Sequence, residues 1–320
     1  YPDYAEIDAA YLAMGEFYFS QKNTGTAQAA YAKIVDTWPN SKFYRYAQYK
    51  LAWTYLNLAD DESYRTAIQL FKSVVESIRV DDKNSSDGQI DENTLDIGVV
   101  TFRNQALNDL SVTYAELPDG WKDARDYLKD KLPPDKARTK LVQLAAILDG
   151  QAKYEESIEL YQDLIAEDPT SPDLPDLLKR QINAYELSNR PLEAEQTREK
   201  RIYALLPGQT WTRANEDKAK SKIHKENAAD IYQVAMKLLI AAADEKNKDK
   251  QMADYAQAEK WLALYLQHYP NEDRAFDVTF SHAFVMDEQS DDALTQLKKS
   301  SKAQEFNHNS RLLLPKLEAT

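Results

Sequence analysis

The sequence predicts an all-α protein, a right-handed α-solenoid of about seven helix-turn-helix repeats. Two observations predict this fold class: glycine is scarce, and one pattern of large and small residues recurs along the chain. Only 7 of the 320 residues are glycine, about a third of average usage. Hairpin-rich β architectures and phosphate-binding loops need glycine at positive φ, whereas helices joined by short turns need little of it.

The clearest repeat lies at residues 11–39. Its first helix is marked by Tyr11, Met14, Gly15 and Tyr18, and its second by Ala27, Tyr31, Ile34 and Pro39. Small residues let two antiparallel helices approach closely, large residues fill the space around them, and proline ends the second helix. This is the spacing of the tetratricopeptide repeat. A second copy in the same register spans residues 141–169, with Leu144, Ala145 and Tyr161 at equivalent positions.

Looser copies occupy most of the remaining chain. They lie at residues 51–74, 110–128, 178–194 and 239–270. In the copy that starts at residue 178, Arg198 occupies the position that is usually aromatic. We expect a seventh unit with Phe280 and Phe284 on its first helix and Ala293 and Leu297 on its second, followed by a capping helix within residues 301–320.

Three segments interrupt the repeat. Residues 80–93 are polar and acidic, which indicates an exposed loop between the second and third units. Residues 207–214 indicate a second loop, ahead of an unusually long helix at about 218–243, and residues 244–254 form a charged insertion. We therefore expect three parts: residues 1–130 with three units, residues 135–206 with the central repeats, and residues 207–320 with the long helix and the capping helix.

Composition excludes several classes of function. The net charge of −13 argues against a sequence-independent nucleic-acid binder and against binding to an anionic membrane surface. The absence of cysteine excludes disulfides and thiolate zinc sites. The best apolar run, residues 234–243, contains Lys237 and is too short to span a bilayer.

No constellation for catalysis is evident, so we expect no enzyme activity, no cofactor and no metal. The four histidines are scattered, and His268 is expected at a helix end, where it faces the helix dipole. Paired acids such as Asp60 and Asp61 are expected at helix caps. Residues 82–93 approach a calcium-loop spacing, but Gly88 falls one position late and Asn93 replaces the glutamate. An ordinary acidic loop is the preferred interpretation, and calcium binding is the alternative.

Four segments carry a more specific resemblance. They are AAYLAMGEFYFSQKNTGTAQAAYAKIVDTWPNS, YAQYKLAWTYLNLADDESYRTAIQLFKSV, LPDGWKDARDYL and AEDPTSPDLPDLLKRQINAYE. The first two resemble the repeats of bacterial envelope tetratricopeptide proteins, including BamD-like outer-membrane lipoproteins. The last two resemble tetratricopeptide proteins of gliding-motility machinery. The resemblance implies a non-catalytic scaffold in the cell envelope, periplasmic or associated with the outer membrane.

Two sets of residues are candidates for partner binding. Tyr46, Tyr49 and Trp53 form a helical stripe, with Lys50 and Asn57 beside it, on the side of the repeat expected to form the concave groove. Neighbouring first helices also pack on one another, so the stripe is either structural or interactive.

The second set is Lys179, Arg180 and Asn183. Lys179 and Asn183 stand at the positions that tetratricopeptide carboxylate clamps use to hold a C-terminal carboxylate, although the basic residues expected in the following units are out of register. Arg180 is either a further contact or a solvated side chain. The excess of 20 tyrosines over 9 phenylalanines also suggests an adhesive surface.

These observations predict a protein-protein interaction scaffold with a peptide or protein partner and no nucleic acid. The alternative is a cytoplasmic regulatory adaptor that recruits a small GTPase or another signalling protein.

Overall fold

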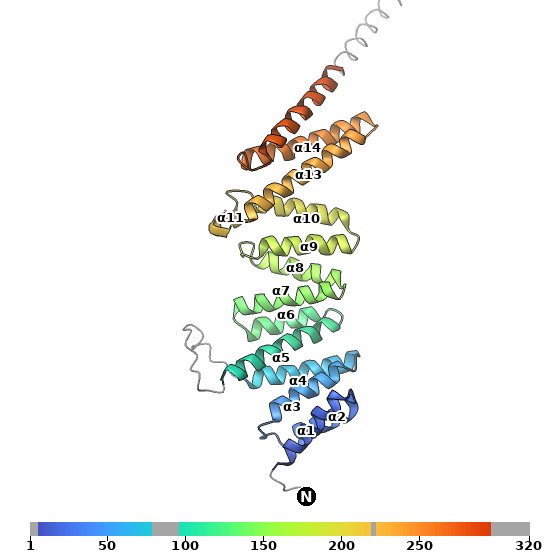
Figure 1. Ribbon diagram of the computed structural model, residues 1–320, viewed down its shortest axis with the longest axis vertical. Helices are drawn as coiled ribbons and strands as arrows, with labels where there is room; N and C mark the ends of the chain where they lie inside the picture. The colour runs from blue at the N-terminus through green and yellow to red at the C-terminus, as the bar shows by residue number, and fades with distance from the viewer. Residues whose placement is uncertain (1–5, 79–95, 219–221, 296–320) are drawn as a thin grey trace, which may run out of the picture. The chain divides into compact units, whose positions relative to one another are not determined.

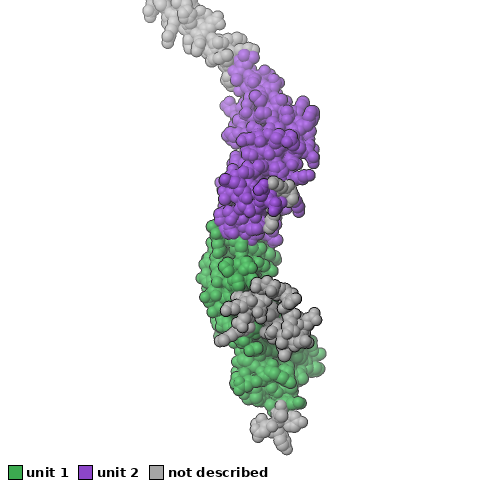
Figure 2. All heavy atoms as spheres, turned by 90° about the vertical axis from the view of Figure 1, so that its left-hand side faces the viewer, with its two compact units in different colours: residues 1–167, 184–190 green, residues 168–183, 191–320 purple. Residues whose placement is uncertain are grey.

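The computed structural model describes residues 6–78, 96–218 and 222–295, and within these ranges every regular element is a helix. The predicted all-α solenoid of helical hairpins is confirmed (Figure 1). The chain divides into two compact units, which Figure 2 distinguishes by colour. Unit 1 comprises residues 1–167 and 184–190, and unit 2 comprises residues 168–183 and 191–320.

Unit 1 contains four consecutive helical hairpins. Their helices are α1 (Ile7–Ser20), α2 (Thr24–Thr37), α3 (Tyr44–Leu56), α4 (Asp61–Ser77), α5 (Asp96–Glu116), α6 (Gly120–Lys131), α7 (Pro134–Gly150) and α8 (Tyr154–Glu167). Each helix packs on the next one along the chain, as Figure 1 shows. The hairpins therefore coincide with the repeats predicted at residues 11–39, 51–74, 110–128 and 141–169.

The crossing of α1 and α2 shows why the repeat needs a small residue. A Cβ atom added to Gly15 would lie 2.5 Å from Cε1 of Tyr31, so no larger residue fits there without moving that ring. Tyr31 is fully buried, and its hydroxyl donates a 2.7 Å hydrogen bond to Oε1 of Glu16. Leu144 and Ala145 are completely buried at the equivalent positions of α7. The close helix-helix contact expected at Gly15 is thus present.

Five hairpin turns contain a residue in the left-handed region, and none of the five is glycine. They are Lys22, Ala59, Asp119, Ala152 and Asn189, with φ between 54° and 59°. The last of them connects α9 (Leu174–Leu187) to α10 (Pro191–Ala204). The start of α4 is capped in the expected way, because Asp60 accepts a hydrogen bond of 2.9 Å from the Ser63 amide.

Unit 2 contains two short helices followed by long ones. After α10 come α11 (Thr210–Ala214), α12 (Glu216–Lys218), α13 (His224–Asp244) and α14 (Lys248–His268), followed by a helix described over residues 275–295. The long helix expected near 218–243 corresponds to α13. The charged insertion expected at 244–254 is largely helical, because Asn247 caps α14 by accepting a 3.0 Å hydrogen bond from the Lys250 amide.

The loop predicted at residues 207–214 is wrong in part, because its second half is α11. Trp211 is only 2% exposed, and its indole N–H donates a 2.7 Å hydrogen bond to the Ser171 carbonyl. Asn215 donates a 2.8 Å bond to the Thr170 carbonyl. Burial of one large aromatic side chain thus outweighs the turn-forming tendency of the preceding proline and glycine.

The seventh hairpin differs from the prediction. Residues 275–295 form one continuous helix that carries Phe280, Phe284 and Ala293 together. No glycine or proline lies between residues 284 and 293 to stop the helix. Leu297, the acidic loop at 80–93 with its calcium alternative, and the capping helix at 301–320 lie outside the described residues.

Candidate partner-binding surface

The first helices of the four hairpins in unit 1 are joined by polar side-chain contacts. Lys50 of α3 forms an ion pair with Glu16 of α1, with Nζ 3.3 Å from Oε1. Asp109 of α5 accepts hydrogen bonds from α3, and the ammonium of Lys140 on α7 donates to the amide oxygen of Asn108 on α5. We call the surface formed by these residues the first-helix face of unit 1.

Two of the predicted stripe residues hold α3 against α5. The Tyr49 hydroxyl donates a 2.7 Å hydrogen bond to Oδ2 of Asp109, and the Trp53 indole donates a 3.2 Å bond to the same atom. Tyr49 is 6% exposed, and its ring centroid lies 5.1 Å from that of Phe102 and 5.8 Å from that of Phe71. Tyr49 and Trp53 therefore serve the packing of neighbouring first helices.

The Asp109 carboxylate is a half-buried acceptor. Burial raises its pKa, and the hydrogen bonds from Tyr49 and Trp53 oppose that rise because they favour the charged form. Burial and the bond to Asp109 also raise the pKa of Tyr49. Burial lowers the pKa of Lys140 on the neighbouring helix. Asp109, Tyr49 and Lys140, which join the helices, are thus partly or fully shielded from water.

Tyr46 is the stripe residue that is open to solvent. It is 39% exposed, and its ring centroid lies 6.3 Å from that of Phe102. Lys50, beside it, is held by Glu16 and lies with Nζ 4.4 Å from the centroid of the Phe19 ring. Asn57 is exposed just after the end of α3. The accessible part of the stripe is therefore Tyr46, flanked by an ion pair.

Sequence reasoning missed the partners of the stripe. Three residues complete the face: Glu16 on α1, and Phe102 and Asp109 on α5. None of them lies on α3, the helix that carries the stripe. Glu16 occupies the same position in the first repeat as Trp53 does in the second. Comparing equivalent positions across repeats would have pointed to Glu16, whereas Asp109 has the sequence pattern of a solvated residue.

The second predicted set lies in unit 2, on the part of α9 that precedes residue 184. Lys179 and Asn183 are exposed and one helical turn apart, as a clamp requires. The guanidinium of Arg180 lies 3.0 Å from the Asp176 carboxylate, one turn earlier on the same helix. Their role in partner binding stays a prediction.

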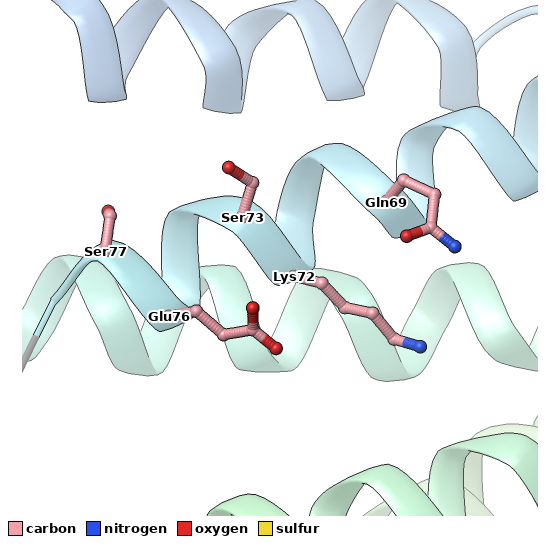
Figure 3. Close-up of a pocket in the computed structure, with 5 residues that line it drawn as sticks. All are labelled: Gln69, Lys72, Ser73, Glu76 and Ser77. Carbon is pink, nitrogen blue, oxygen red and sulfur yellow. The ribbon is translucent and has the colours of Figure 1, made fainter.

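The described residues contain no group of three or more histidine, aspartate or glutamate side chains that could hold a metal ion. His268 ends α14, as expected. Figure 3 shows a pocket whose lining residues, Gln69, Lys72, Ser73, Glu76 and Ser77, all come from α4. Lys72 and Glu76 extend along one side of that helix, and Ser73 and Ser77 lie on the other. One cation and one carboxylate on one helix do not form a catalytic set.

Residues 9–41, which cover α1, α2 and the turn that follows, match the family model described as tetratricopeptide repeat. One tetratricopeptide repeat is therefore identified, at the first hairpin of unit 1. No curated protein is significantly similar to this chain. None of the helices in the described part of the chain is both long and apolar enough to cross a membrane.

Two solved structures resemble this chain. One is that of MamA protein, which is 18% identical, with a TM-score of 0.34 over 68% of this chain and 97% of MamA. The other is the C-terminal part of a TPR repeat-containing protein from Cytophaga hutchinsonii, which is 14% identical. Its TM-score is 0.25 over 82% of this chain and 97% of that one.

Proposed function

We propose that this protein is a non-catalytic interaction scaffold that binds a peptide or protein on the first-helix face of unit 1. One observation carries the proposal: Tyr46 is 39% exposed beside an ion pair, on a row of helices that side-chain hydrogen bonds hold in place. A rigid aromatic side chain with a polar end loses little entropy when it becomes part of an interface.

The face offers a partner both apolar and polar contacts. The rings of Tyr46 and Phe102 provide an apolar surface at the α3–α5 boundary. Glu16, whose side chain is 40% exposed, provides acceptor oxygens next to the Lys50 ammonium. An extended peptide with an apolar residue and hydrogen-bonding neighbours suits such a surface.

We place the scaffold in a bacterial cell-envelope machine of the outer-membrane assembly or gliding-motility type. The resemblance of four segments to envelope tetratricopeptide proteins supports this placement. Fractionation of cells that express the full-length tagged protein tests it. Recovery in the periplasm or with the outer membrane is the expected result, and recovery only in the cytoplasm would favour the regulatory adaptor instead.

Photo-crosslinking tests the surface directly. Tyr46 is replaced by a photoreactive phenylalanine analogue in the otherwise intact protein, and the same analogue is placed at Arg65 as a matched control. Arg65 is exposed on α4, the second helix of the same hairpin. We expect a crosslinked partner from position 46 and none from position 65. Equal products from both positions, or none from position 46, would reject the proposal.

A pair of substitutions separates binding from folding. Tyr46→Ala should weaken capture of the crosslinked partner by about tenfold or more, with unchanged helical circular dichroism, because this side chain is largely at the surface. Tyr49→Ala should instead lower the melting temperature, because it removes a buried ring and leaves Asp109 without one of its donors. Capture that is unaffected by Tyr46→Ala would show that the stripe is purely structural.

A further inference from the structure

The helix at residues 275–295 in unit 2 has one face packed and another face open. Val278 and Val285 are completely buried in a core that includes Leu262, Tyr265 and Tyr269 of unit 2. Gln289 donates a 3.4 Å hydrogen bond to Glu259 of α14. These contacts fix which side of the helix is turned toward α14.

The open face carries large apolar side chains at helical spacing. Phe276 is 82% exposed and Phe280 is 72% exposed, one helical turn apart. Phe284, a further turn along, is 46% exposed and borders the packed side, because its ring centroid lies 6.1 Å from that of Tyr255 on α14. Met286 and Leu294 are also about half exposed, at 51% and 47%. Such a stripe is unlike the scattered surface residues that soluble proteins tolerate.

The repeat register shows what normally covers such a face. Phe280 and Phe284 occupy the positions held by Leu144 and Leu148 in the complete repeat of unit 1. Leu144 and Leu148 are completely buried, because α8 packs on α7. The stripe on 275–295 is therefore the side of a first helix on which a second helix would pack.

The charges around the stripe restrict what can bind there. Asp287 and Asp291 are exposed and lie on the same side of this helix as the stripe, and no lysine or arginine lies between residues 275 and 295. The ion pair that this helix forms with Arg274, at 3.2 Å, involves only Asp277. An occupant with basic side chains flanking an apolar stripe would be attracted, whereas an anionic membrane or the same face of a second copy would be repelled.

We infer that this face binds a basic amphipathic α-helix of a partner protein, which packs on it as the second helix of a complete repeat packs on the first. The apolar side of the partner helix would cover Phe276, Phe280 and Phe284, and its lysines or arginines would lie over the acidic residues nearer the end of the helix. This surface lies in unit 2 and is independent of the proposed first-helix face of unit 1, so either can fail alone.

A peptide-binding experiment tests the inference with the intact chain. The probe is a fluorescent helical peptide of 14 residues, the length of α2, α8 and α10, with leucines at i, i+4, i+7 and i+11 and lysines beside them. Two control peptides have glutamate in place of lysine or the same residues in scrambled order. We expect fluorescence anisotropy to report binding of the lysine peptide, weaker at high salt, and no binding of either control.

Substitutions locate the binding site. The double variant Phe276→Ser, Phe280→Ser should weaken binding by at least about tenfold, because two anchors of the apolar stripe are lost. Phe17→Ser is the matched control, since Phe17 is 59% exposed on α1 of unit 1. It should bind as the unchanged protein does. Absence of binding by the lysine peptide, equal binding of the glutamate peptide, or equal loss in both variants would overturn the inference.

Crosslinking identifies the occupant in the native setting. A photoreactive residue at position 280 of the full-length protein should yield an adduct with another protein through a basic helical segment, located by mass spectrometry of the crosslinked peptides. An adduct within the same chain, or between two copies of it, would show a different occupant and would also overturn the inference.

Discussion

At the residue scale, the hairpin turns explain how the fold manages with so little glycine. Each of five turns has one residue at φ between 54° and 59°, and in two of them that residue is alanine, Ala59 and Ala152. An L-residue in this region places its Cβ close to the following carbonyl oxygen, which costs about 1 kcal/mol. The fold therefore contains small local strains that glycine would relieve.

Ala152→Gly should consequently stabilise the protein. Ala152 is exposed in the turn between α7 and α8, so the substitution changes only the backbone preference. We expect a gain of about 0.5 to 1 kcal/mol in the free energy of unfolding, measured by urea denaturation. The control is Ala13→Gly, at an exposed position inside α1, which should lose about as much. A loss of stability in both variants would show that the turn carries no strain.

The sequence predicts the role of a single residue best where that role depends on neighbours close in the chain. Gly15 was predicted at a close helix contact, and Asp60 at a cap, because each follows from local spacing or backbone chemistry. Asp109 could not be predicted, because its donors lie about 56 to 60 residues earlier in the chain. Only the stacking of α3 on α5 reveals that this carboxylate is half-buried and accepts these hydrogen bonds.

At the scale of elements, Arg201 joins three helices of unit 2. Its guanidinium pairs with Asp230 of α13, and Nη2 lies 3.7 Å from Glu226 of the same helix. Nε donates a 3.3 Å hydrogen bond to the Pro175 carbonyl of α9. The pKa of Asp230 is raised by burial despite the attraction of Arg201. Arg198, which stands at the usually aromatic position of this repeat, also lies on α10, and its charge likewise opposes the rise in the pKa of Asp230.

Arg201→Ala should destabilise unit 2. Arg201 is 4% exposed, and its removal leaves the Asp230 carboxylate partly buried without its partner, at a cost of about 3 kcal/mol. Hydrogen exchange should show faster opening of α10 and α13, with the amides of α1–α4 unchanged. The double variant Arg201→Leu, Asp230→Leu should recover most of the loss. Equal destabilisation by the single and double variants would mean that packing around Arg201, and not its charge, stabilises this region.

The elements themselves were predictable where the repeat is regular. The helices α1–α4 and α7–α8 follow from positions such as Tyr31, Ala52 and Leu144, all of them buried. The prediction failed at Trp211, because a proline and a glycine nearby suggested a loop while burial of the indole favoured a short helix. The prediction also failed at residues 275–295. The repeat register predicted a turn between two helices there, whereas the structure has one continuous helix, in agreement with the helical propensity of these residues.

At the scale of the whole molecule, the many buried tyrosines make the fold sensitive to alkali. Burial raises the pKa of Tyr269 from its ordinary value of 10.0 to about 12. Burial likewise raises the pKa of Tyr31, Tyr49, Tyr114 and Tyr127. An unfolded chain releases these protons near pH 10, whereas the folded chain retains them. The stability they contribute is therefore complete below about pH 10 and is lost as the pH rises through the folded pKa values.

We expect helical circular dichroism to fall above about pH 10, together with the appearance of tyrosinate absorbance. Tyr269→Phe should move the alkaline midpoint to higher pH, because it removes one of the groups whose ionisation favours unfolding. Its control is Tyr203→Phe, at a position that is 46% exposed, which should leave the midpoint in place. Identical midpoints in both variants would mean that Tyr269 does not contribute to the transition.

The packing of each helix of unit 1 on the next one along the chain also has a mechanical consequence. A load applied to the two ends of unit 1 passes from each hairpin to the next in series, because no strand or disulfide within the described residues bypasses a hairpin. Under tension the unit should therefore extend in small steps, one hairpin at a time, and recover as each hairpin repacks on its neighbour. Unit 1 would then extend reversibly under small forces and limit the force transmitted between molecules bound at its two ends.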